Sequence, residues 1–309
     1  MTHGFSRMAA ELAEAPAVVA AQAAALAPSL RELGARLGRR PPRVIVTCAR
    51  GSSAHAATFA KHLVERYCGI PVAAAAPVVA SVYRRPLGLD GQLFLAISQS
   101  GRSDDLVEAA RLAQRAGALT AALVNVTDSP LAAGCDIVLP IAAGAELSVA
   151  ATKSFVASLS ALLRWIALWR DDAAIERAVA RLPERLVAAA ALDWEQAVEA
   201  LTESVSLAAI GRGPTLAIAR EGALKLKEVC NIHAEAFSGA EFRHGPLALV
   251  TRAYPVMVFA ARDGTAAGLR LLAENLRQKQ AMLLFADPGA AGNGGFPGKA
   301  LRPARQPGA

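Results

Sequence analysis

The sequence predicts an α/β fold with two parallel-sheet units, each flanked by helices. Three observations predict it. Short β-branched runs alternate with helical stretches, the alternation occurs twice along the chain, and hydrophobic residues make up 54% of the 309 residues. Strands that alternate with helices pair in parallel through right-handed crossovers, and a chain of this length can bury more than one core.

The first unit is expected at residues 41–171, after an Ala- and Leu-rich helical segment at 1–40 that the sequence RRPP ends. Its strands are predicted from the apolar runs 43–48, 70–76, 92–98, 119–126 and 135–141. Its helices are predicted at 53–68, 103–116 and 149–170.

A helical connector is expected at 172–203, with Pro183 in a first helical turn. The second unit follows at 204–287, where the pattern predicts strands at 205–211, 254–261 and 281–287 and helices at 215–230 and 265–279. Residues 288–309 are rich in Gly, Pro, Ala and Arg without periodicity, which predicts a disordered tail.

Composition argues against several classes of protein. The net charge of +7 comes partly from arginines in one linker and in the tail, and only 5% of residues are aromatic, so no nucleic-acid partner is expected. No run reaches about 18 uninterrupted apolar residues and the start lacks a signal-peptide layout, so we expect a cytoplasmic protein without membrane spans. The four cysteines are scattered and are expected to be small buried residues, with no metal site.

A cluster of polar residues interrupts the third predicted strand in the stretch AISQSGRSDDL, and it consists of Ser98, Gln99, Ser100 and Ser103. Ligands of open parallel sheets bind beyond the carboxyl ends of strands, where helix N-termini offer free N–H groups to a phosphate. The stretch has no P-loop lysine and no G-x-G-x-x-G pattern, so no nucleotide cofactor is expected. The alternative is an ordinary serine-rich turn with Ser103 as a helix N-cap.

A second stretch strengthens the first interpretation. Gly51, Ser52 and Ser53 follow the first predicted strand in the same strand–turn–helix arrangement. Two such loops from neighbouring strands form a site for a small phosphorylated, polyhydroxylated ligand.

A third polar stretch lies at residues 219–249. Glu221, Lys225 and Glu228 are spaced i, i+4, i+7, so one helix face presents a carboxylate, an ammonium group and a second carboxylate. The alternative is a surface ion pair of little energetic weight. His244 precedes Gly-Pro in a predicted loop, where a histidine can transfer protons. Together these groups could move protons on a sugar.

Three motifs carry a family resemblance, namely SQSGRSDD, VAATKSF and the long stretch EGALKLKEVCNIHAEAFSGAEFRHGPLAL. They resemble the sugar isomerase (SIS) family over residues 40–287, in particular the isomerase half of glucosamine-6-phosphate synthase and the stand-alone SIS-type glucosamine-6-phosphate deaminases. The resemblance implies two flavodoxin-like units related by pseudosymmetry, packed as a homodimer.

The resemblance also implies roles for residues. The residues implied to hold the substrate phosphate are Ser98, Gln99, Ser100, Ser103 and Ser52. Those implied to line the sugar are Gly51, Ser53, Val149, Ala150 and Glu221, the valine and the alanine through backbone groups. Glu228 would move the proton between C1 and C2, His244 would open the pyranose ring from the neighbouring subunit, and Lys225 would supply an amine near the substrate.

Within the family, the resemblance favours the deaminase branch. Arg50 and Ala151 stand where the synthase has Cys and Ser, and the start Met1-Thr2 shows no glutaminase domain. We therefore expect glucosamine 6-phosphate to give fructose 6-phosphate and ammonia, without a cofactor. Two alternatives stay open: another aminosugar phosphate, such as galactosamine 6-phosphate, or a sensor without catalysis.

The end of the chain departs from the family. Nothing after Asp287 resembles the family's final strand and helix, so the second unit is expected to be truncated at its C-terminus. The family's tail lysine, which enters the sugar site, has no matching position. We therefore expect weakened catalysis from this chain.

Overall fold

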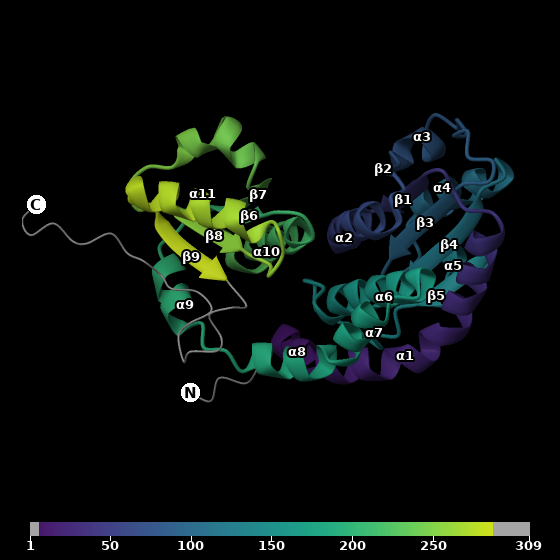
Figure 1. The fold of residues 1–309 in the computed structure, drawn as a ribbon, viewed down its shortest axis with the longest axis horizontal. Helices are drawn as coiled ribbons and strands as arrows, with labels where there is room; N and C mark the ends of the chain where they lie inside the picture. The colour runs from purple at the N-terminus through teal and green to yellow at the C-terminus, as the bar shows by residue number, and fades with distance from the viewer. Residues whose placement is uncertain (1–5, 287–309) are drawn as a thin grey trace, which may run out of the picture. The chain divides into compact units, whose positions relative to one another are not determined.

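The computed structural model describes residues 6–286 and divides into two compact units, Met1–Ala190 and Ala191–Ala309 (Figure 1). Unit 1 contains a parallel sheet of five strands in the order β2-β1-β3-β4-β5. These strands are β1 (Ile45–Ala49), β2 (Val72–Ala74), β3 (Leu93–Ser98), β4 (Leu119–Val124) and β5 (Ile137–Pro140). All five follow the predicted apolar runs, and their parallel pairing confirms the predicted fold class for this unit.

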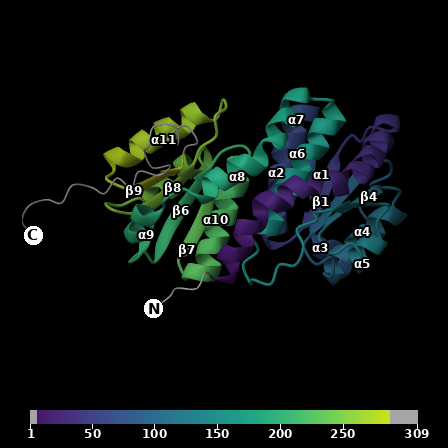
Figure 2. The ribbon, with the colours of Figure 1, turned by 90° about the horizontal axis from the view of Figure 1, so that it is seen from below.

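Helices cover both faces of this sheet. They are α1 (Arg7–Arg39), α2 (Gly51–Cys68), α3 (Pro77–Ser81), α4 (Asp104–Arg115), α5 (Pro130–Ala133), α6 (Lys153–Arg170), α7 (Ala173–Ala180) and α8 (Leu182–Ala190). Alternate residues of each strand point to opposite faces, so Phe94 and Ala96 pack with Leu106 of α4 in one core cluster. The other face carries α1, α2 and α6, which lie beside one another in Figures 1 and 2. Because both faces are covered, β3 is buried along its whole length.

Helix α1 is long and apolar enough, by composition alone, to cross a membrane, with an 18-residue window of mean hydropathy 1.2. Its buried stripe includes Val19, Leu26 and Leu33 and packs in unit 1, chiefly beside α6. Core helices of globular proteins pass the same composition test, so α1 is weak evidence for a membrane span.

Unit 2 contains a parallel sheet of four strands in the order β7-β6-β8-β9. The strands are β6 (Ser206–Gly211), β7 (His233–Ser238), β8 (Pro255–Phe259) and β9 (Met282–Ala286). The helices are α9 (Glu195–Leu201), α10 (Thr215–Cys230) and α11 (Ala266–Gln278), with short 3₁₀ turns η1 (Glu241–His244) and η2 (Pro246–Leu249). Phe242 is fully buried in the core beside Leu269 and Leu272 of α11.

The two sheets share one strand order. Numbered within each unit, the first sheet reads 2-1-3-4-5 and the second reads 2-1-3-4. Each unit therefore repeats the same topology, as the predicted pair of flavodoxin-like units requires. No fifth strand occurs in unit 2 up to Ala286, where the description ends, and the predicted tail at 288–309 lies outside the described residues.

The structure differs from the predicted elements in several places, and the short elements α3, α5, η1 and η2 were not predicted. Strand β7 was not predicted, because its exposed His233 and Glu235 made this short edge strand look like part of a polar loop. Helix α6 begins at Lys153 rather than near residue 149. The predicted helical stretch at 172–203 is three separate helices, α7, α8 and α9.

We expect replacement of Asp136 by Asn to destabilise unit 1 by about 1 kcal/mol at neutral pH. The Asp136 carboxylate accepts hydrogen bonds from the Thr120 N–H and hydroxyl, both at 2.8 Å, and from Gln114 at 2.9 Å. Burial raises the pKa of Asp136, but these hydrogen bonds and the Arg36 charge outweigh it, so the pKa lies below its ordinary 3.8.

The folded-state pKa of Asp136 is depressed, so its contribution is present above the ordinary value and is lost as pH falls through the lowered one. Denaturant unfolding against pH should therefore show the wild-type and Asn variant curves converging in acid. The exposed Asp128, replaced by Asn, serves as the control. A gap that persists unchanged below the lowered pKa would contradict the assignment.

Candidate active site

A cavity of about 270 Å³ lies at the carboxyl edge of the unit 1 sheet. Six residues predicted to bind a ligand line it: Ser52, Ser53, Ser98, Gln99, Ser100 and Ser103. The other lining residues are Arg50, Ile97, Leu106, Ile141, Ala151, Ser154, Phe155 and Ser158. Strands β1 and β3 are hydrogen-bonded neighbours, with Ala49 paired to Ile97, so the loops that follow them meet at one place.

Three helices begin at this cavity. Ser52 and Ser53 lie in the first turn of α2, Ser103 is the N-cap residue of α4, and Ser154 lies in the first turn of α6. The first N–H groups of a helix have no partner inside the helix, and its N-terminus carries partial positive charge. At α6 the Thr152 and Ser154 N–H groups already donate to the Glu146 carboxylate, so it is the starts of α2 and α4 that suit an anion with several oxygen atoms, such as a phosphate monoester.

The loop between β3 and α4 is held by its own hydrogen bonds. The Ser98 hydroxyl accepts from the Gly101 N–H at 3.0 Å, and the Ser100 hydroxyl accepts from the Arg102 N–H at 3.3 Å. Gly101 has a φ of +63°, and a Cβ there would lie 2.0 Å from the Ser129 hydroxyl oxygen. Only glycine fits this position without a shift of its neighbours.

Ser103 occupies the N-cap position of α4, but its side chain makes no capping hydrogen bond. Ser103 is one of the residues that line the cavity. An N-cap serine that served only to begin a helix would direct its oxygen at the backbone N–H groups of the first turn. The capping hydrogen bond expected of an ordinary serine-rich turn is therefore not formed by Ser103.

Arg50 is the one charged side chain among the lining residues. Its guanidinium forms an ion pair with Asp105, in the first turn of α4. Hydrogen bonding by Ser81, together with the Arg50 charge, lowers the pKa of Asp105 against the effect of burial. Asp105 is therefore a carboxylate bound to Arg50 and is absent from the lining, so it does not occupy the place of a phosphate.

The remaining sugar-site residues predicted in unit 1 lie beside the cavity. Gly51 is next to Ser52 at the start of α2, with a φ of +53°. The Val149 side chain is 97% exposed, and Ala150 is buried at 2%. Neither lines the cavity, whereas the next residue, Ala151, does.

The lining residues Ser154, Phe155 and Ser158 were not predicted as site residues. They lie on α6, which follows a long irregular segment and not a strand. The site residues were predicted from turns that join a strand directly to a helix, and α6 has no such turn. The signal that could have found them is the spacing of Ser154 and Ser158, one helical turn apart at the start of an otherwise apolar helix.

The predicted proton-transfer residues lie in unit 2. Lys225 of α10 bridges two carboxylates, with its Nζ 2.7 Å from Glu228 Oε2 and 3.4 Å from Glu221 Oε1. Glu221 is buried, and Glu228 lies near the exposed end of the helix. His244 ends η1 and is exposed. The structure thus brings the first three residues together on one helix face and places the histidine on another element.

The loop after β8 in unit 2 corresponds in strand order to the loop between β3 and α4 in unit 1, which carries Ser100 and Ser103 and is called the serine loop below. Its Asp263 carboxylate accepts hydrogen bonds from the Thr265 N–H at 2.9 Å and the Thr265 hydroxyl at 2.6 Å. Thr265 is the N-cap residue of α11. A carboxylate of the chain itself therefore lies at the helix start of unit 2, where unit 1 has its cavity.

Residues 6–286 contain no group of three or more His, Cys, Asp or Glu side chains that could hold a metal ion. Burial raises the pKa of Cys48 and of Cys135 to about 12, so both thiols are protonated at neutral pH. Cys48 is buried, Cys68 and Cys135 are half-buried, and Cys230, which ends α10, is exposed, so the expectation that every cysteine is buried was wrong.

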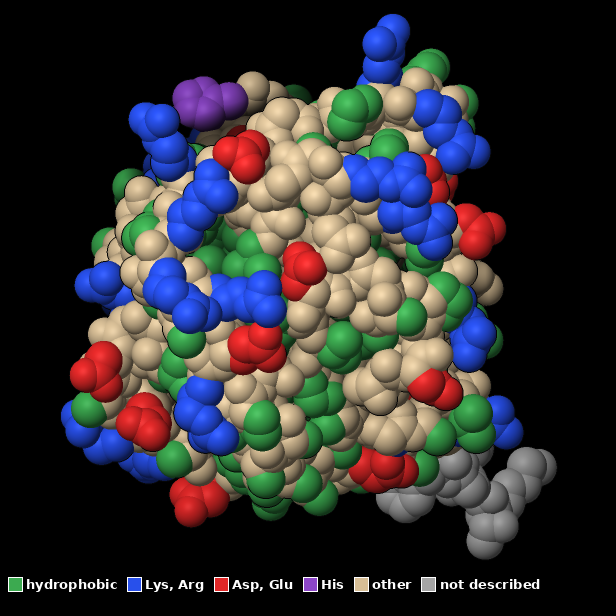
Figure 3. Space-filling model, turned by 90° about the vertical axis from the view of Figure 1, so that its right-hand side faces the viewer, with side chains coloured by type: hydrophobic (Ala, Val, Ile, Leu, Met, Phe, Trp, Pro, Cys, Tyr) green, Lys and Arg blue, Asp and Glu red, His purple; other side chains and the backbone are tan. Residues whose placement is uncertain are grey.

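Charged side chains are mixed on the face of the molecule drawn in Figure 3. Several Lys and Arg side chains lie next to Asp or Glu there, with uncharged surface between the clusters. This face therefore offers no continuous basic surface of the kind that tracks a nucleic-acid backbone.

A family model described as SIS domain matches residues 40–167 and 200–287. The isomerizing glutamine–fructose-6-phosphate aminotransferase of Zymomonas mobilis is 39% identical over 227 residues, which are 70% of this chain and 37% of that protein. The chain spans less than half the length of the curated aminotransferases it matches.

Two solved structures match over almost the whole chain. A candidate phosphosugar isomerase from Silicibacter pomeroyi is 42% identical with a TM-score of 0.88, and the match covers 92% of this chain and 87% of that one. The C-terminal domain of glucosamine-fructose-6-phosphate aminotransferase from Francisella tularensis is 28% identical with a TM-score of 0.78, covering 96% and 88%.

We expect Gly101→Ala to destabilise unit 1 by about 2 kcal/mol or more, because the new Cβ meets Ser129 and the left-handed φ disfavours alanine. Denaturant unfolding measures the change. The matched control is Gly88→Ala, whose Cβ would meet nothing within 4 Å. Equal stability of the two variants would show that the serine loop relaxes easily.

Proposed function

Because the chain belongs to the SIS domain family, we propose that it is an aldose–ketose isomerase that acts on a phosphorylated aminosugar and releases ammonia. Two of the relatives described above are named as a phosphosugar isomerase and an isomerizing glutamine–fructose-6-phosphate aminotransferase. The substrate proposed is glucosamine 6-phosphate, and the products are fructose 6-phosphate and ammonia. The setting proposed is the cytoplasm.

The observation that carries the proposal is the hydroxyl-lined cavity at three helix N-termini. Five of the seven lining serines and one glutamine can donate to phosphate oxygens, since the hydroxyls of Ser154 and Ser158 already donate within the chain. The helix starts supply positive potential. Phosphate is remote from C1 and C2 of a hexose, so binding it here can fix the reacting carbons against a base elsewhere.

The proposed chemistry balances without a cofactor. In the open-chain aldehyde, a base removes the C2 proton and returns it to C1, which converts the amino-aldose into a C2 imine. Water adds to the imine carbon, the C–N bond breaks and ammonia leaves, giving the ketose phosphate. A carboxylate suits the proton transfer, since it can accept and return one proton in the same site.

We assign these steps to residues of unit 2. Glu228 is the base, Lys225 orients it and contacts the developing oxygen charge, and His244 moves the proton that opens the ring. Support comes from the 2.7 Å contact between Lys225 and Glu228, which holds the carboxylate on one helix face. The assignment also takes His244 from a second copy of the chain in a homodimer.

The direction of reaction is inferred from the lining of the cavity. Arg50 and Ala151 both line it, at the two positions where the resemblance separates deaminases from the synthase. Arg50 adds a positive charge near the phosphate. Its guanidinium, which is paired with Asp105 in this structure, can form an ion pair with the ligand instead.

The decisive experiment incubates the full chain with glucosamine 6-phosphate and measures ammonia and fructose 6-phosphate, with galactosamine 6-phosphate in parallel. We expect Glu228→Gln to lower kcat by about 100-fold or more while sugar phosphate still raises Tm. Glu274→Gln, on exposed α11, is the control. If only galactosamine 6-phosphate is turned over, the proposed substrate is wrong and galactosamine 6-phosphate replaces it. If a sugar phosphate binds but none is turned over, the chain is a sensor and not an enzyme.

We expect Arg50→Met to raise KM for the sugar phosphate about 10-fold with little change in kcat, because the charge acts on the phosphate and not on the reacting carbons. Initial rates at several salt concentrations test this, and the variant should lose part of the salt dependence. The exposed Arg102, replaced by Met, is the control. If the Arg50→Met variant has the same KM as the wild type, Arg50 does not contribute to phosphate binding.

A further inference from the structure

One wall of the cavity is a segment with little regular structure. Residues 141–152 connect β5 to α6, and Ile141 and Ala151, near its two ends, both line the cavity. Ala142 and Gly144 have φ values of 56° and 70°, so the segment leaves β5 in a strained conformation. Since no sheet ladder holds it, its shape depends on side-chain contacts.

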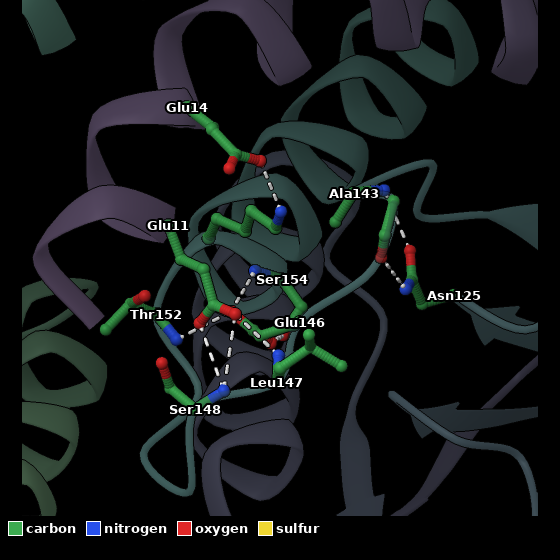
Figure 4. A network of polar contacts seen from close by, with 11 residues as sticks. Glu11, Glu14, Asn125, Ala143, Glu146, Leu147, Ser148, Thr152 and Ser154 are labelled. Carbon is green, nitrogen blue, oxygen red and sulfur yellow. Dashed lines mark hydrogen bonds and ion pairs between the residues drawn. The ribbon is translucent and has the colours of Figure 1, made fainter. Parts of the chain in front are cut away.

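Two of these contacts come from unit 1 close to the segment. Asn125, just after β4, donates to the Gly144 carbonyl and accepts from the Ala143 N–H, both at 2.8 Å (Figure 4). Glu146 accepts from the Thr152 N–H at 2.9 Å and from the Ser154 N–H at 3.2 Å. Glu146 thus caps α6, and Asn125 fixes the start of the segment.

The other contacts come from α1, more than a hundred residues away in sequence. The Glu11 carboxylate accepts from the Leu147 N–H at 2.5 Å and from the Ser148 N–H at 3.2 Å, as Figure 4 shows. Glu14 pairs with the buried Lys153 at 2.5 Å. Gln22, fully buried, donates to the carbonyls of Ile141 and Ala157 at 2.7 and 2.8 Å.

Glu11 and Gln22 lie on the buried stripe of α1, which otherwise consists of Ala15, Val19, Leu26, Leu30, Leu33 and Leu37, whereas Glu14 is exposed. Glu11 is only 6% exposed, and a carboxylate is costly to bury unless it accepts strong hydrogen bonds. A helix that merely covered a sheet would carry apolar residues at both positions. The partners of Glu11 are the backbone N–H groups of Leu147 and Ser148, within the segment whose two ends line the cavity, so Glu11 fixes the course of that segment.

We propose that Glu11 is a positioning residue of the cavity, which holds residues 147–148 so that Ala151 and the first turn of α6 face the ligand. Helix α1 is then part of the binding apparatus. The inference takes the identity of its ligand from the proposed function, but the link between α1 and the wall stands on the contacts alone.

The test compares Glu11→Ala and the conservative Glu11→Gln with wild-type full chain. We expect Glu11→Ala to raise the Kd for glucosamine 6-phosphate about 10-fold and to speed amide exchange across residues 147–155, with kcat at saturation within about twofold. Glu11→Gln should fall between, because its amide oxygen still accepts. Glu32→Ala removes an exposed carboxylate of the same helix and should match the wild type.

A purely structural role would lower Tm without changing Kd or local exchange, and that result would overturn the inference. Faster exchange with an unchanged Kd would overturn it as well. If the wild type binds no glucosamine 6-phosphate, the proposed function fails. The role of Glu11 is then tested by measuring the Kd for inorganic phosphate with the same variants. If Glu11→Ala binds phosphate with the same Kd as the wild type, the positioning role is contradicted.

Discussion

The candidate site depends on one arrangement: three helices begin at the same edge of a parallel sheet. The parallel pairing of β1 and β3 brings the starts of α2 and α4 together, and both loops end in hydroxyl side chains. The starts of α2 and α4 leave N–H groups without intrahelical partners, whereas N–H groups at the start of α6 donate to Glu146. The electrostatic preference for an anion is therefore a property of the backbone, and the serines refine its shape.

The third helix start is supplied in a different way. Helix α6 follows an irregular segment, so no ladder places Ser154 at the cavity. Its position depends on side chains of α1 and on the Glu146 cap. Burying Glu11 and Lys153 with partners exchanges some stability for a defined geometry, a common use of buried polar groups.

The sequence was informative where signals are local. Strand β3 and the serines after it are adjacent in sequence, so one pattern predicted both the element and the site residues. The pattern missed β7, whose exposed side chains hide its single buried Ala234 from a hydrophobicity argument. It also missed the role of α1, because Glu11 contacts Leu147 across 136 positions of sequence. The spacing of Glu11, Ala15, Val19 and Gln22 on one helix face is the signal that could have shown it.

The Asp263 carboxylate has a consequence for how the two halves of the chain have diverged. Unit 2 repeats the strand order of unit 1, yet its equivalent helix start is already neutralised by a resident negative charge. In unit 1 the first-turn carboxylate Asp105 is instead paired with Arg50, which lines the cavity. The same strand order therefore gives two helix starts whose carboxylates have different partners.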